Sequence, residues 1–145
     1  MAELVLIVRF AGQRVALPAA AVESVVEVEA LAPVPGAAPH IAGLAALRSR
    51  VLTVVDCAAS LAPGGRLPAE SREAAVTVID GHAYALLVEG VEDVVEAEAG
   101  QSPPLPLAGG WARISGGAVE AGGDLLLVAD LAALIAGPPA AALSA

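Results

Sequence analysis

The chain has 145 residues, of which 57% are hydrophobic and only 2% aromatic, and its net charge is −9. This composition supplies a core of Val, Leu, Ile and Ala and is far from that of a disordered chain. All seven cations are arginine. Nucleic-acid binding is disfavoured because it needs clustered cations and aromatic stacking platforms, and binding to anionic lipid is disfavoured by charge.

Short apolar runs between turn residues predict an all-β fold with short helices. Residues 4–10 and 14–17 flank a turn signal, and a helical turn is expected over 18–22. A partly exposed strand is predicted over 23–29 and a proline-rich loop over 33–36. A second hairpin over 41–56 follows, then a brief helix over 58–61 and a linker over 62–73.

The second hairpin is unusual in its charge. Arg48 and Arg50 flank Ser49 at the turn of a chain that has few cations. A short polar interruption between two β-rich runs predicts that the chain folds back on itself here. We therefore expect this turn to bind another protein.

Several features bear on the compartment. Cys57 is the only cysteine, which predicts a reducing compartment and a small buried hydrophobe rather than a reactive thiol. Glu3 and Arg9 interrupt the N-terminal apolar run, which argues against a signal peptide. Asp130 interrupts the apolar stretch 125–145, which a strand, a short helix and a loose tail over 137–145 explain better than a membrane span. We expect a soluble cytoplasmic protein without membrane insertion.

The chain contains an internal repeat. Residues 12–30 align with 81–99 at a constant offset of 69, which places Gly12 on Gly81 and Glu23 on Glu92. Residues 41–43 match 114–116 and residues 54–59 match 128–133, which implies one inserted residue at the second copy's hairpin turn. Two copies, 4–61 and 74–135, predict two small five-stranded barrels of SH3 or OB type within one domain spanning 1–145.

Divergence between the copies is informative, because duplicated scaffolds specialise where they differ. The first hairpin turn carries Arg48 and Arg50, whereas the second runs from Glu120 to Asp124 and is acidic and glycine-rich. Repeated residues are expected to serve the fold. In particular, Asp56 and Asp130 are expected to cap the helices that follow them.

No catalytic or cofactor site is recognisable. His40 and His82 lack Cys or carboxylate partners at metal-ligand spacing. The glycine pairs are not followed by Lys-Ser/Thr or by a Rossmann helix, so no phosphate loop is predicted. The acids between Glu89 and Glu98 invite a glycosidase interpretation, but they alternate like a solvated strand face and no aromatics accompany them. We expect neither an enzyme nor a cofactor.

Residues 41–56 resemble the signature hairpin of the CheW-like family, with Gly43 and Arg48 at the family's spacing. Residues 4–10, 22–25, 87–94 and 125–134 also resemble that family, so that the similarity covers about 3–135. The resemblance implies two five-stranded barrels that exchange strands. It also implies a non-catalytic adaptor of bacterial chemotaxis, a two-component signal-transduction system.

The resemblance implies two partners and a set of contact residues. The partners are the regulatory domain of a CheA-type histidine kinase and the cytoplasmic hairpin tip of a chemoreceptor, which lies in the groove between barrels. Val22, Gly43 and Arg48 match family positions tied to receptor or kinase coupling. We add Arg50, the second cation of the turn, to this candidate receptor- or kinase-binding set.

The sequence departs from the family pattern at four positions. Ala46 replaces the usual Asn, Ser49 the usual turn Gly and Thr53 the usual Pro, while Asp124 stands where an Arg commonly precedes the last strand. A residue other than Gly at positive φ costs on the order of 1 kcal/mol, so a turn of another shape is one expectation. These departures favour a divergent paralogue, which could serve a second array or a non-chemotaxis kinase pathway.

Alternatives stay open for Arg48 and for the function. Arg48 either anchors a carboxylate or helix-end carbonyls of a partner, or forms an intramolecular pair with Asp56 or Glu120. A second functional hypothesis is a sensory β-barrel that binds a small ligand in the cleft between barrels. A third is an enzyme that uses the acids between Glu89 and Glu98.

Overall fold

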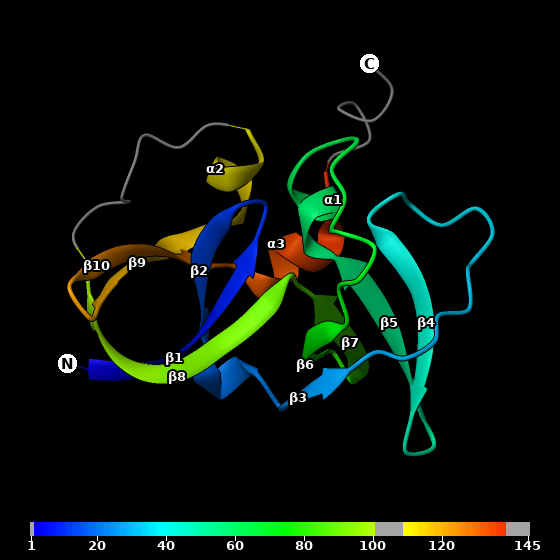
Figure 1. Cartoon of the computed structure of the whole chain (residues 1–145), viewed down its shortest axis with the longest axis horizontal. Coiled ribbons are helices and arrows are strands. Elements are labelled where there is room, and N and C mark those ends of the chain that lie inside the picture. The colour runs from blue at the N-terminus through cyan, green and yellow to red at the C-terminus, as the bar shows by residue number, and fades with distance from the viewer. Residues whose placement is uncertain (1, 101–108, 139–145) are drawn as a thin grey trace.

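The chain forms two five-stranded β-subdomains with short helices between them (Figure 1). The computed structural model describes residues 2–100 and 109–138. In chain order the elements are β1 (Ala2–Phe10), β2 (Gln13–Pro18), the 3-10 helix η1 (Ala19–Ala21), β3 (Ser24–Glu27), β4 (Ile41–Leu47), β5 (Arg50–Asp56), α1 (Cys57–Leu61), β6 (Glu73–Ile79), β7 (His82–Leu87), β8 (Gly90–Ala99), α2 (Gly110–Ile114), β9 (Ser115–Ala121), β10 (Asp124–Ala129) and α3 (Leu131–Ala136).

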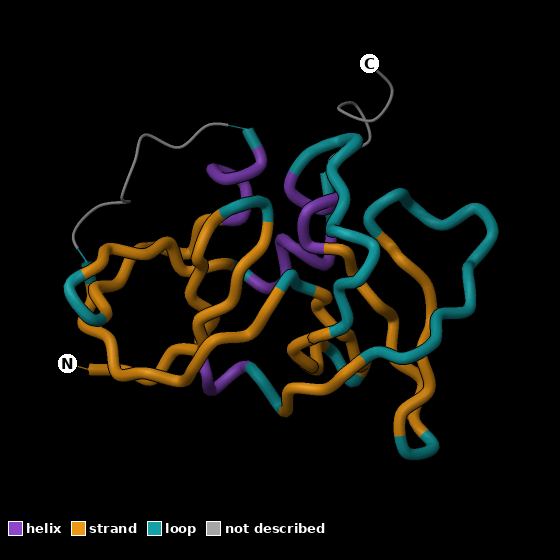
Figure 2. Tube along the Cα trace, in the orientation of Figure 1, coloured by secondary structure: helices purple, strands orange, loops and turns teal. Residues whose placement is uncertain are grey.

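Each subdomain combines strands from both repeats. The first is a closed barrel in the order β1-β2-β10-β9-β8, and the second is a sheet in the order β3-β6-β7-β5-β4. The predicted fold class and strand exchange are therefore confirmed. In the second sheet the end strands β3 and β4 are not paired, and an isolated bridge between Ala32 and Leu44 holds the loop after β3 against β4. Figure 2 shows the strands of the two subdomains in orange, with α1 and α3 in purple between them.

The pairing registers of the two copies are related by the offset of 69. Ser24 pairs with Val76, and at an offset of 69 the same pair recurs as Asp93 with Ile7. The parallel pairing of β5 with β7 recurs as the parallel pairing of β10 with β2. The expected helix caps are also confirmed, because Ala59 N donates to Asp56 at 3.0 Å and Ala133 N donates to Asp130 at 3.2 Å.

The insertion predicted at the second hairpin turn is wrong. Both hairpins have two-residue turns, since the last pairs are Leu47 with Arg50 and Ala121 with Asp124. The offset between copies is thus 74 throughout the hairpin, and the extra length falls before β9. The counterpart of Gly43 is Gly117, which also has positive φ, and not Gly116, on which the local match in the sequence had placed it.

One hydrophobic cluster joins the subdomains. Phe10, Leu86 and Leu134 are among its fully buried members, and they come from the barrel, the second sheet and α3. Two smaller clusters fill the interiors of the barrel and of the second sheet. Strand alternation explains the division, because Val5 and Ile7 face the barrel interior while Leu6 and Val8 face the shared cluster.

Polar contacts fix the helices over this shared cluster. The Arg113 guanidinium donates to the carbonyls of Ala133 at 2.5 Å and of Ser60, which ties α2 to α3 and α1. His40 is buried, and its Nε2 lies 2.8 Å from the Ile135 carbonyl oxygen near the end of α3. None of the helices within residues 2–100 and 109–138 combines the length and apolarity required to cross a bilayer. Residues 139–145 of the predicted tail lie outside the described residues.

The two hairpin turns provide a matched test of backbone strain. Arg48 and Ser49 have φ of +50° and +68°, where the second copy has Gly122 and Gly123 at +58° and +86°. A side chain at such φ costs about 1 kcal/mol or more relative to glycine. We expect Ser49→Gly to raise the free energy of unfolding by about 1 kcal/mol and Gly123→Ser to lower it similarly. Chemical denaturation measures both, and equal stability of all three proteins would contradict the assignment.

Candidate functional site

The arginine-bearing turn keeps the hairpin shape of the second copy. Positive φ at both central residues is the requirement of a type I′ turn, whose twist matches that of the flanking strands. Arg48 and Ser49 meet it, although neither is glycine. The expected change of turn shape is therefore not seen relative to the second copy, and the missing glycine instead leaves strain in the backbone.

Arg48 projects from this turn without an internal partner. It is exposed and forms no hydrogen bond or ion pair within the part of the chain that the structure describes. The carboxylate of Asp56 instead accepts from the backbone N–H groups of Ala59 and Leu67. Neither Asp56 nor Glu120 is paired with Arg48 there, so the intramolecular alternative for Arg48 has no support in these contacts.

Arg50, in contrast, is bound to Glu23. Its Nη2 donates to Glu23 Oε1 at 2.5 Å, and both side chains remain exposed by more than two fifths. The hydrogen bond from Arg50, together with its positive charge, lowers the pKa of the Glu23 carboxyl and raises that of the Arg50 guanidinium. The pair ties the hairpin to the segment between η1 and β3.

Val22 and Gly43 occupy different surroundings. Val22 directly follows η1 and is half-buried against the shared cluster. Gly43 is buried in β4 at φ +150°, where a Cβ would lie 2.7 Å from the Ala32 carbonyl oxygen. Gly43 is thus required by the close approach of the loop that bridges to β4. The structure brings Val22 and Arg50 together through Glu23, but it leaves Gly43 and Arg48 apart from them.

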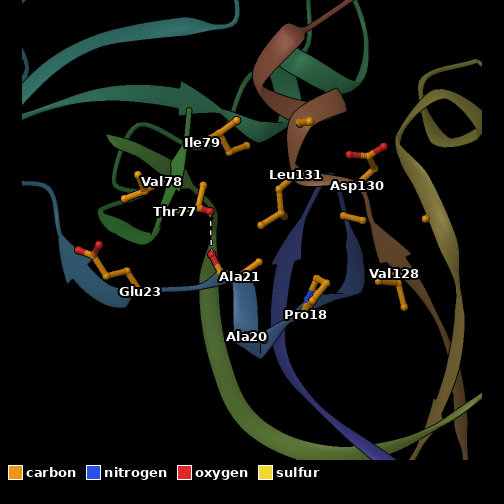
Figure 3. Close-up of a pocket in the computed structure, with 13 residues that line it drawn as sticks. Pro18, Ala20, Ala21, Glu23, Thr77, Val78, Ile79, Val128, Asp130 and Leu131 are labelled. Atoms are coloured by element: carbon orange, nitrogen blue, oxygen red, sulfur yellow. Dashed lines mark hydrogen bonds between the residues drawn. The ribbon is translucent and has the colours of Figure 1, made fainter. Parts of the chain in front are cut away.

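A groove lies between the two subdomains, beside Glu23. Its volume is about 670 Å³, and it is walled by η1 and β6 on one side and by β10 and the start of α3 on the other (Figure 3). The lining is mostly apolar, with Glu23, Thr77 and Asp130 as polar side chains. Thr77 Oγ1 donates to the Ala21 carbonyl at 2.7 Å and holds η1 against β6. None of the four predicted contact residues lines this groove, whereas Glu23 does.

Sequence reasoning missed Ile79, Asp130 and Leu131 as groove residues. The signal for Asp130 was present in its match to Asp56, but that match was assigned to helix capping alone. Ile79 belongs to β6, whereas Asp130 and Leu131 follow β10. Only the folded arrangement of strands brings these segments face to face, so no linear pattern identifies the residues that line the groove.

The acids of the second copy are paired within the barrel. Arg9 and Arg14 contact Glu92 at 3.2 and 3.1 Å, and Arg14 also contacts Asp124 at 3.1 Å. Glu92 is the counterpart of Glu23, so both equivalent acids bind arginine. Asp124, which stands where the family commonly has Arg, is accommodated by Arg14.

The remaining chemistry of the described residues is sparse. Cys57 is buried, and burial raises the pKa of its thiol well above the ordinary value, as expected for a small hydrophobe. Within residues 2–100 and 109–138, no group of three or more His, Cys, Asp or Glu side chains has the arrangement of a metal site. A second cavity of about 400 Å³ lies near His40, Asp56 and Arg66.

Comparison with known proteins places this geometry in context. The model of the family described as CheW-like domain matches residues 4–138. The crystal structure of the scaffolding protein TtCheW from Thermoanaerobacter tengcongensis is similar, with a TM-score of 0.74, 19% sequence identity and 89% of each chain covered. At this identity the likeness supports the fold. No curated protein sequence matches the chain.

The Arg50–Glu23 pair leads to a testable difference between the two turn arginines. Because Arg50 lowers the pKa of Glu23, Arg50→Gln should return that pKa upward toward the ordinary glutamate value. Arg48→Gln should leave it unchanged, since Arg48 has no contact with Glu23. Carboxyl carbon NMR titration measures the pKa of Glu23 in each variant. An equal effect of the two substitutions would contradict the assigned pair.

Proposed function

Since the chain belongs to the CheW-like domain family and shares its fold with the scaffolding protein TtCheW, we propose that it couples a chemoreceptor to a CheA-type histidine kinase as a non-catalytic adaptor. The protein acts in the bacterial cytoplasm and is recruited to receptor arrays at the membrane. The single observation that carries this proposal is the apolar groove between the subdomains, with the Arg50–Glu23 pair at its edge.

The groove suits an amphipathic helix. Ile79, Leu131 and the alanines of η1 supply an apolar lining, and an apolar helix face buries its side chains in such a groove. The receptor tip, a helical hairpin, offers that kind of face. Glu23 and Arg50 then meet polar groups of the receptor at the edge of the groove.

Arg48 supplies a second anchor. An exposed guanidinium without an internal partner is free to donate to a carboxylate or to helix-end carbonyls of a bound protein, with planar and bidentate geometry. The strained turn holds it away from the body of the sheet. We assign Arg48 to a contact with the partner. Gly43 instead allows the loop at Ala32 to approach β4 closely, and so has a structural role in the same hairpin.

An adaptor must present two surfaces on one rigid body. The shared cluster and the exchanged strands make the two subdomains a single packing unit, so a partner held in the groove is fixed relative to a partner held elsewhere. The regulatory domain of the kinase docks on a surface other than the groove, and both partners bind at the same time.

Substitution of Arg48 tests the anchor. Arg48→Ala should weaken binding to a receptor tip fragment on the order of tenfold, because a lost hydrogen bond to a charged group costs about 1.5–3 kcal/mol. The melting temperature should not change, since Arg48 forms no hydrogen bond or ion pair with the described residues of the chain. Arg66→Ala is a matched control, because Arg66 is also exposed and lies on the linker. Unchanged tip affinity in Arg48→Ala would contradict the assignment.

The kinase partner is tested by co-purification. The tagged protein, expressed with the kinase and receptor encoded beside it, should retain a CheA-type kinase through its regulatory domain. The readout is the kinase recovered per adaptor, with and without that domain. Recovery that does not depend on the regulatory domain would contradict the proposed coupling. Recovery of a kinase from a different pathway would favour the alternative of a non-chemotaxis adaptor.

A further inference from the structure

We infer that Asp130 binds a backbone N–H of the partner, and that the part of the partner at Asp130 is a non-helical turn that carries an apolar side chain. For the identity of the partner this rests on the proposed function. The duplication supports it, because the protein fills the counterpart of the groove with its own linker.

The two repeats define that counterpart residue by residue. The offset of 74 places Asp56 on Asp130 and Ala42 on Gly116, and the offset of 69 places Phe10 on Ile79. Asp130, Gly116 and Ile79 all line the groove. A second groove of the same construction would therefore lie beside Asp56, Ala42 and Phe10.

In the counterpart the linker closes this space. Leu67 N–H donates to Asp56 Oδ2 at 3.2 Å, while Asp56 Oδ1 caps α1 through Ala59 N. The half-buried Leu67 side chain packs against the shared cluster. Trp111 covers fully buried Phe10, with ring centroids 5.8 Å apart. The smaller cavity shares Asp56 and Ala42 with this counterpart, and its other walls come largely from the linker and from the segment before β4.

Within residues 2–100 and 109–138, the groove beside Asp130 is open. Asp130 Oδ1 caps α3 through Ala133 N, but Oδ2 has no hydrogen-bond partner within residues 2–100 and 109–138. Ile79 is half-buried where its counterpart Phe10 is fully buried. Ile79 and Leu131 line the same groove as Asp130 and supply part of its apolar wall (Figure 3).

The chemistry of the closed side determines what fits the open side. A segment placed like Leu67 gives its N–H to Asp130 Oδ2 and sets its apolar side chain against Ile79 and Leu131. The interior N–H groups of a helix are already bonded four residues back and cannot donate, whereas those of a turn or of a first helical turn are free. The turn at the receptor tip therefore contacts Asp130, while a helix face fills the rest of the groove.

Asp130→Asn tests this contact with little effect on the fold. Asparagine is as good an N-cap as aspartate, but its amide nitrogen replaces the second acceptor oxygen with a donor. The affinity for the receptor tip fragment should fall on the order of tenfold with the melting temperature retained. Asp56→Asn makes the same change on the closed side, and it should lower the melting temperature and leave the tip affinity unchanged.

Calorimetric titration of the full-length variants with the tip fragment gives the result. Wild-type affinity in Asp130→Asn would overturn the inference, as would equal loss of affinity in Asp130→Asn and Asp56→Asn. A wild-type protein that binds no receptor tip would refute the proposed function. In that case a peptide of residues 62–71, which contains Leu67, tests separately whether the open groove binds a turn through Asp130. At millimolar concentration, that peptide should shift the amide signals of Ile79, Gly116 and Leu131 in the wild-type protein but not in Asp130→Asn. No shift at these positions in the wild-type protein would overturn the inference.

Discussion

The shared hydrophobic cluster between the subdomains is the constraint on which the rest of the structure depends. Neither repeat can form its own sheet, because β1 and β2 pair with strands of the second copy and β6 and β7 with strands of the first. The apolar faces of both sheets then meet in a single cluster that also receives α1 and α3. The groove lies along the edge of this junction, and its shape is therefore set by the same contacts that hold the fold together.

Much of the fold could be predicted from local chemistry. Turn glycines, apolar alternation and the register of residues 12–30 on 81–99 are short-range signals, and the strand pairings follow them. The carboxylates of Asp56 and Asp130 could be identified as caps because an N-cap contacts a backbone group only three residues away. The position of the insertion could not, since neighbouring glycines at 116 and 117 match Gly43 equally well until pairing selects one of them.

The candidate site was less accessible for a physical reason. Arg48 and Arg50 are two residues apart and chemically identical, yet one is unpaired and the other binds Glu23. The difference depends on where the hairpin lies relative to the segment after η1, which is a tertiary relation. The groove is more remote still, because Ile79 and Asp130 are separated by fifty residues and meet only through strand exchange. Sequence reasoning could therefore identify the family, the hairpin and the existence of a groove between the barrels, but not the residues that line it.

Duplication also explains why one groove is open. A symmetric pair of repeats would present two equivalent grooves and could bind two copies of the same partner. An adaptor that joins two different proteins instead needs two different binding faces. Here the linker contributes Leu67 and the segment before β9 contributes Trp111 of α2, and within residues 2–100 and 109–138 the groove beside Ile79 is open. The two copies also differ in charge at the hairpin turn. Arg50 and Asp124 occupy equivalent positions, but Arg50 pairs with Glu23 whereas Asp124 pairs with Arg14. The connections between elements, rather than the repeated strands, therefore determine which face of this scaffold can accept another protein.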